Sequence, residues 1–182
     1  MLFLVRHAHA DYGPDEMRGL SPAGRAAAAH VADVLASQGI ARIYSSPYAR
    51  AIETVQPLAD RLGVPIAIND DLRERRLAGG PLDDFRAVLE VTWRDFGLVP
   101  PGGESSAAAQ ARVTRAIRRI GATTPGPIAI ASHGNALALF LHTLDADVDF
   151  SFWARMSTPD VFVVERAGPD PWTFRRLWSE PR

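Results

Sequence analysis

The 182-residue sequence contains no cysteine, which excludes disulfides, thiol nucleophiles and thiolate metal sites. It also contains no lysine, because all 20 side chains counted as Lys or Arg are arginine. An arginine is therefore weak evidence for anion binding here unless its position in a motif supports that role. The 20 cations oppose 21 anions, and the resulting net charge of −1 is unlike that of a nucleic-acid-binding protein.

Long apolar runs are absent as well. A bilayer-spanning helix needs about 20 apolar residues, and no apolar run in this sequence is nearly that long. The first apolar run ends at Arg6 and is too short for a secretory signal peptide. With 47% apolar and 23% charged residues, the composition is typical of a soluble globular protein. We therefore expect a cytoplasmic protein without membrane or nucleic-acid partners, folded as a single domain over residues 1–182.

Short apolar runs alternate with amphipathic stretches along the chain. The first 68 residues predict a β-α-β-α-β order, in which each helix opens on a Ser-Pro pair and stops at a glycine. Residues 69–103 interrupt this order, and we expect them to form a lid or cap insertion. The patterns predict an α/β fold, a three-layer sandwich whose mostly parallel central sheet has helices on both faces.

The predicted strands are residues 2–6, 42–45, 64–68 and 127–132, followed by an antiparallel hairpin of 161–166 and 172–178. The first predicted helix begins at Ser21-Pro22 and stops at Gly39, and the second begins at Ser46-Pro47 and stops at Gly63. Three further helices are predicted over residues 82–96, 104–121 and 135–144.

Polar side chains follow several of these strands at the point where each strand ends. His7 follows the first strand, Ser45 and Ser46 follow the second, and His133 follows the strand at 127–132. Ligands of open α/β sheets bind outside the carboxyl ends of the strands. We therefore expect both imidazoles at one edge of the sheet, together with Arg6 and with Arg50 from the first turn of the second helix.

These residue types suit chemistry on a phosphoryl group. A neutral imidazole is a competent nucleophile, and histidine is the side chain that titrates near neutral pH. Neighbouring guanidinium groups disfavour the imidazolium form and match phosphoryl oxygens through paired hydrogen bonds. We interpret the sheet edge as a phosphate pocket.

Three segments resemble, in order, the motifs of the histidine phosphatase superfamily, also called phosphoglycerate-mutase-like. They are LVRH at residues 4–7, SSPYARA at 45–51 and SHG at 132–134. Two intermediate landmarks are similar, LRE at 72–74 and PGGES at 101–105. The resemblance implies a phosphoglycerate-mutase-like fold and a metal-independent phosphatase. The enzyme would act on a small phosphorylated metabolite through a phosphohistidine, without a cofactor.

The resemblance also implies a role for individual residues. His7 would be the nucleophile, and Arg6, Arg50 and His133 would complete the phosphate pocket. Glu74 would protonate the leaving alcohol and then activate water. The other candidates for this acid are Asp70, Asp71 and Glu104, and the further candidates for substrate contact are His9 and Arg18.

The chain departs from the family pattern at three positions. Ala8 and His9 stand where the family commonly has glycine and an acid or amide, and Gly13 stands where an asparagine is frequent. The chain is also shorter than typical mutases of the family, which favours a phosphatase with a modest lid.

Three other functions stay open. A phosphoglycerate-mutase-type phosphotransferase would use the same chemistry. A metal-dependent hydrolase could use His7 and His9 as a His-x-His pair, with Asp11 and His133 nearby. A non-catalytic module could simply bind a phosphorylated molecule. The sequence predicts a monomer or a homodimer without deciding between them.

Overall fold

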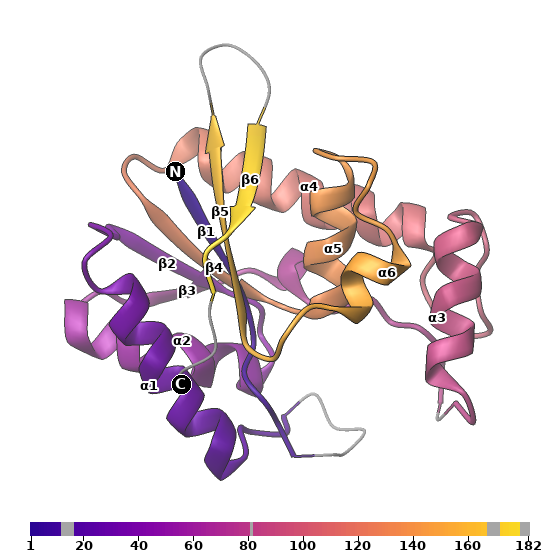
Figure 1. Cartoon of the computed structure of the whole chain (residues 1–182), viewed down its shortest axis with the longest axis horizontal. Coiled ribbons are helices and arrows are strands. Elements are labelled where there is room, and N and C mark those ends of the chain that lie inside the picture. Colours follow the sequence, from indigo (N-terminus) through magenta and orange to yellow (C-terminus); the bar gives the residue numbers. More distant parts are fainter. Residues whose placement is uncertain (12–16, 81, 167–171, 179–182) are drawn as a thin grey trace.

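The computed structural model describes residues 1–11, 17–80, 82–166 and 172–178. Within them the strands form one six-stranded sheet in the order β3-β2-β4-β1-β5-β6 (Figure 1). Strands β1 to β4 are parallel to one another, whereas β5 runs antiparallel to β1 and β6 antiparallel to β5. The bounds are β1 Leu2–Arg6, β2 Arg42–Ser45, β3 Ile66–Ile68, β4 Ile128–Ser132, β5 Asp160–Arg166 and β6 Trp172–Arg176.

Alternate residues of the central strands enter two separate cores, as the two-residue period of a strand requires. Phe3 and Val5 pack in one core with α1 and α2, while Leu2 and Leu4 pack in the other, mainly with α4 and α5. Figure 1 shows these helix pairs on opposite sides of the sheet, which confirms the three-layer prediction. The helices are α1 Pro22–Leu35, α2 Ala49–Leu62, the 3₁₀ turn η1 Asp70–Leu72, α3 Phe85–Arg94, α4 Ser106–Thr123, α5 Gly134–His142 and α6 Phe150–Ala154.

The first two helices differ from the prediction at their ends. Ser21 caps α1 as expected, but the helix ends at Leu35, and a turn then leads to Gly39 at a φ of 66°. Helix α2 begins at Ala49 instead of Ser46. The hydroxyl of Ser46 is bonded to the ring of His133, and its backbone N–H donates to Ala131, so Ser46 stays beside β4.

The remaining differences concern short elements. Strand β3 and helix α3 are both shorter than predicted. Helix α6 was not predicted, because a single five-residue turn shows no apolar period. The closing hairpin is confirmed, although its connecting residues 167–171 lie outside the described part of the chain.

Two aromatic side chains are among the groups through which residues 69–103 contact the body of the fold. The ring of Phe85 on α3 lies 6.3 Å from that of Trp153 on α6, and Trp93 Nε1 donates to Asn135 Oδ1 on α5. That these residues act as a lid stays a prediction. Among the described helices, none is long and apolar enough to cross a membrane.

Candidate active site

The carboxyl ends of β1 and β4 place the two predicted histidines side by side. These strands are parallel neighbours, with Arg6 in register with Ser132, and the backbone N–H of His7 donates to Ser132 at 3.0 Å. The imidazole centroids of His7 and His133 are 5.2 Å apart. The strand-end pattern in the sequence therefore predicted this convergence correctly.

The hydrogen bonds of His7 define which ring nitrogen carries its proton. Nδ1 lies 2.7 Å from the carbonyl oxygen of Ala8, which can only accept, so Nδ1 is the donor. Burial, the largest cause, lowers the pKa of His7 to about 3, and the charges of Arg50, Arg6 and Arg18 act in the same direction. His7 is therefore neutral at pH 7, with its lone pair on Nε2.

Arg50 faces that lone pair. Its Nε donates to His7 Nε2 over 3.3 Å, and its guanidinium lies 4.7 Å from the centroid of the Tyr48 ring. Thr54, one turn further along α2, donates to the carbonyl of Arg50 and accepts the N–H of Ala8. Thr54 thus ties the Arg50 helix to the loop that follows His7.

Arg6 lies against the beginning of α5, where the chain has Gly134. A Cβ at position 134 would lie 2.9 Å from Cζ of Arg6, so a larger residue would displace the guanidinium. Nη1 of Arg6 donates to the carbonyl of Met156, while Nε is buried without a partner among the described residues. Burial lowers the pKa of Arg6, although the negative charges of Glu74 and Asp160 raise it.

His133 is fully buried and has one nitrogen engaged. Its Nε2 lies 2.7 Å from the hydroxyl of Ser46, whereas Nδ1 has no partner within the part of the chain that the structure describes. Burial, followed by the charges of His7 and Arg50, lowers the pKa of His133 well below its usual value. This edge of the sheet therefore has two buried nitrogens, Nε of Arg6 and Nδ1 of His133, without a hydrogen-bond partner among the described residues.

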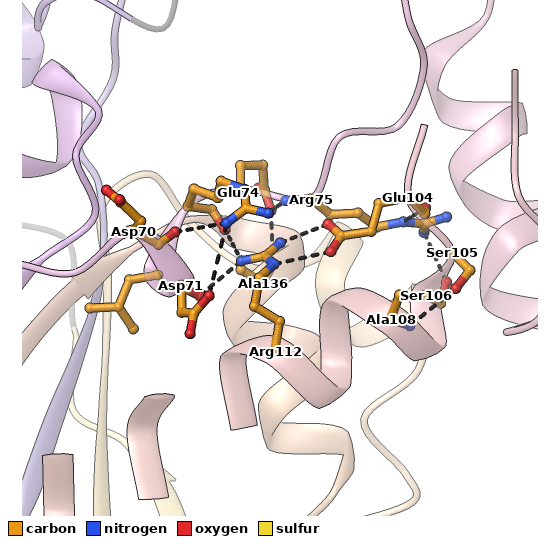
Figure 2. Close-up of polar contacts among 12 residues, drawn as sticks. Asp70, Asp71, Glu74, Arg75, Glu104, Ser105, Ser106, Ala108, Arg112 and Ala136 are labelled. Carbon is orange, nitrogen blue, oxygen red and sulfur yellow. Dashed lines mark hydrogen bonds and ion pairs between the residues drawn. The ribbon is translucent and has the colours of Figure 1, made fainter. Parts of the chain in front are cut away.

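Glu74 is the predicted acid that the structure places beside these groups. Its carboxylate accepts the backbone N–H groups of Ala136 at 2.9 Å and Asn135 at 3.1 Å, in the first turn of α5 directly after His133. The alternative Glu104 instead forms an ion pair with Arg112 (Figure 2). Asp70 and Asp71 both belong to η1, and the carboxylate of Asp71 lies 4.0 Å from the guanidinium of Arg73.

His9 and Arg18 occupy the loop between β1 and α1. The ring of His9 is bonded to the hydroxyl of Ser21, the cap of α1, and is otherwise exposed. Arg18 donates to the carbonyl of Asp11, and its charge lowers the pKa of both His7 and His133. Arg18 therefore lies within electrostatic reach of the pocket, whereas the substrate contact of His9 stays a prediction.

The structure describes two of the three positions that depart from the family motif, Ala8 and His9. Ala8 is fully buried, and its methyl group packs with Leu20 and Ala28. Gly13 lies outside the described residues. The rings of His7 and His9 have different partners, Arg50 and Ser21, and the described residues hold no group of three metal-ligating side chains. The geometry thus gives no support to the His-x-His metal site.

Sequence reasoning missed several supporting groups. They are Thr54, Asn135 and the carbonyl of Met156, each of which holds a site residue, and Ser46, which bonds His133 and is not the predicted helix cap. A signal existed for Thr54, which stands four residues after Arg50 on one helix face. Asn135 and Met156 act through backbone groups, which no residue type reveals.

The fold and this pocket together define an α/β protein with a neutral histidine beside arginines at the carboxyl edge of its sheet. The chain belongs to the histidine phosphatase superfamily (branch 1), whose sequence model matches residues 2–177. This match confirms the predicted family and a histidine-phosphatase-type enzyme.

Two relatives illustrate the family. The chain is 29% identical over 158 residues to a glucosyl-3-phosphoglycerate phosphatase of Mycolicibacterium vanbaalenii, covering 75% of this chain and 70% of the relative. It is 31% identical over 154 residues to phosphoglycerate mutase-like protein 4 of Arabidopsis thaliana, covering 75% and 67%.

Solved structures agree on the fold. Bacillus stearothermophilus YhfR superposes with a TM-score of 0.76 at 24% identity, over 97% of this chain and 94% of the other. A mycobacterial glucosyl-3-phosphoglycerate phosphatase superposes with a TM-score of 0.73 at 24% identity, over 97% and 96%. These likenesses confirm the predicted fold class.

Proposed function

We propose that the protein is a metal-independent phosphatase that transfers the phosphoryl group of a small phosphorylated metabolite first to His7 and then to water. One observation carries this proposal. His7 is held neutral by burial and cationic neighbours, and the Nδ1–H bond to Ala8 leaves the lone pair on Nε2, facing Arg50. This is the state that a nucleophile toward phosphorus requires.

In the first step, Nε2 of His7 attacks phosphorus and the bond from phosphorus to the ester oxygen breaks. Arg6, Arg50 and His133 bind the equatorial oxygens, whose charge fixed donors stabilise best. The unpartnered Nε of Arg6 supports this role. Glu74, in its protonated form, gives its proton to the leaving alcohol, and the phosphoryl group stays on Nε2.

In the second step, water attacks the phosphohistidine. Glu74, now a carboxylate, takes a proton from the water, and the N–P bond breaks to return neutral His7 and inorganic phosphate. Backbone donors from Asn135 and Ala136 orient Glu74 in both steps. One group thus acts as acid and then as base, as microscopic reversibility requires.

The substrate class that we propose is a phosphate ester of a small sugar or sugar acid. The names of the relatives support it, since a glucosyl-3-phosphoglycerate phosphatase is among them. Arg18 supplies a further positive charge near the pocket for an anionic substrate, and His9 is proposed to border it. The lid role of residues 69–103, the cytoplasmic location and the choice between monomer and homodimer stay predictions.

The test is hydrolysis of an aryl phosphate in excess EDTA by wild type and His7→Ala, with a panel of sugar and sugar-acid phosphates. We expect turnover that survives EDTA, vanishes in His7→Ala and leaves an acid-labile, alkali-stable phosphoryl label on wild type during turnover. Loss of turnover in EDTA would support the metal-dependent alternative. Isomerisation of phosphoglycerate without phosphate release would instead identify a mutase.

A further inference from the structure

Glu74 stands on a segment with no regular structure. The residues after η1 form neither helix nor strand, so no backbone ladder holds the peptide that carries this carboxylate. The carboxylate itself is oriented by the N–H groups of Asn135 and Ala136. Those bonds form only if the backbone at residue 74 lies at the right distance from α5.

Arg112 on α4 holds that backbone. Its side chain is buried, and its Nη1 donates to two carbonyl oxygens, that of Asp71 at 2.8 Å and that of Arg73 at 3.1 Å. The second belongs to the peptide that joins Arg73 to Glu74. Figure 2 shows the guanidinium between this segment and the carboxylate of Glu104.

Glu104 in turn orients Arg112. Its two oxygens accept from Nε at 3.0 Å and from Nη2 at 2.7 Å, which fixes the plane of the guanidinium. Although burial opposes ionisation, the bonds with Arg112 hold the pKa of Glu104 below its usual value. The backbone N–H of Glu104 also donates to the carbonyl of Arg76, so Glu104 contacts the Glu74 segment directly as well as through Arg112.

The opposite side of the segment is anchored at the pocket. The hydroxyl of Ser132 donates to the carbonyl of Leu72 at 2.7 Å, and Ser132 directly precedes His133. The segment that ends in Glu74 is therefore held between α4 and β4. A buried ion pair often adds nothing to stability relative to apolar residues of similar volume, so stability alone does not account for Arg112.

We propose that Arg112, oriented by Glu104, is a positioning residue that sets the distance between Glu74 and the leaving-group oxygen. The proposal rests on the proposed function, in which Glu74 protonates that oxygen. Arg112 acts only through the carbonyls of Asp71 and Arg73 and touches no reacting atom.

Proton donation matters most for alcohols of high pKa. A nitrophenolate leaves without help, whereas an alkoxide must be protonated as the ester bond breaks. A displaced Glu74 therefore slows alkyl phosphates more than aryl phosphates. A general loss of folded enzyme slows all esters equally, so the two causes give different patterns.

The experiment measures kcat/KM for a series from p-nitrophenyl phosphate to alkyl phosphates, with wild type, Glu74→Gln, Arg112→Met and Ile117→Ala. Ile117 is buried on the same helix, and its aliphatic side chain cannot form a hydrogen bond with the Glu74 segment, so Ile117→Ala is the control for destabilisation. We expect Glu74→Gln to lose about 100-fold or more on alkyl esters and much less on aryl esters. Arg112→Met should lose about tenfold on alkyl esters and under about threefold on aryl esters, whereas Ile117→Ala should lose equally on all of them.

Two outcomes overturn the proposal, and they are distinguishable. If Glu74→Gln steepens the leaving-group dependence while Arg112→Met changes all esters equally, only the positioning role is wrong. If Glu74→Gln leaves that dependence unchanged, the role of Glu74 in the proposed function is wrong, and the positioning role falls with it. Should Arg112→Met not fold, Glu104→Gln must show the same selective loss at smaller magnitude. This change keeps the size of the side chain but replaces one of its two acceptor oxygens by an N–H donor, which loosens the guanidinium of Arg112.

Discussion

At the residue scale, burial contributes more than neighbouring charge to the neutral state of the two site histidines. For both His7 and His133 it is the largest cause of the lowered pKa, ahead of the nearby arginines. The sequence indicated only the charge contribution. A histidine at a strand end becomes desolvated when helices cover both faces of the sheet, and that cover is a property of the fold.

This burial predicts a pH dependence of stability. The unfolded chain protonates histidine near pH 6.5, whereas folded His7 stays neutral down to about pH 3. Between these values the unfolded state binds more protons, so stability falls as the pH decreases. His7→Asn should reduce this slope by about one proton, or about 1.4 kcal/mol per pH unit, in urea unfolding between pH 6 and 4. The exposed His9, changed to Asn, is the control, and equal slopes for both variants would contradict the expectation.

At the element scale, the first turn of α1 is fitted against the loop that follows His7. A Cβ at Gly24 would lie 1.9 Å from the carbonyl oxygen of His9, which itself accepts the N–H of Ser21. Helix packing here needs a residue without a side chain. The close approach also brings the ring of His9 to its bond with Ser21.

Gly24→Ala should therefore destabilise the protein although alanine is the better helix former. Helix propensity alone favours alanine by about 1 kcal/mol, whereas the forced shift of the loop costs about 1–3 kcal/mol. We expect a lower urea midpoint and reduced phosphatase activity, because the displaced loop begins at His7. The exposed Ala26 on the same helix, changed to Ser, should have little effect. A Gly24→Ala variant as stable as wild type would show that the loop yields freely.

At the scale of the whole molecule, the last described residues pack against α1 and β5. After β6 the chain crosses to the α1 face, where Trp178 is buried in the core shared with α1 and α2. Its ring lies 5.1 Å from that of His30 on α1. The backbone N–H groups of Leu177 and Trp178 both donate to Val161 on β5.

Trp178→Ala should consequently destabilise the whole domain by about 3–5 kcal/mol, the usual loss for a buried large aromatic residue. Urea unfolding followed by circular dichroism would show a lower midpoint with an unchanged slope, as expected for one cooperative unit. Arg175→Ala, an exposed change on β6, is the matched control. A second, separate transition in Trp178→Ala would contradict a single cooperative domain.

The sequence predicted the strands of the sheet better than the helices. Strand ends at Arg6 and Ser132 follow from apolar runs that a buried parallel strand requires. The start of α2 was wrong because Ser46, a good helix cap in isolation, is bonded to His133, which is 87 residues away in sequence. Helix α6 escaped prediction because five residues are too few to show a helical period.

The sequence by itself determined the layer order, the convergence of His7 and His133 and the presence of arginine beside them, since these follow from local period and strand direction. The family resemblance already favoured Glu74 over Glu104, but only the tertiary structure placed Glu74 against α5, paired Glu104 with Arg112 and turned Nε2 of His7 toward Arg50. The physical reason is that these arrangements depend on contacts between groups that are distant in the sequence, the backbone of α5 with Glu74 and the side chain of Arg50 with His7. Local residue types carry no record of those contacts.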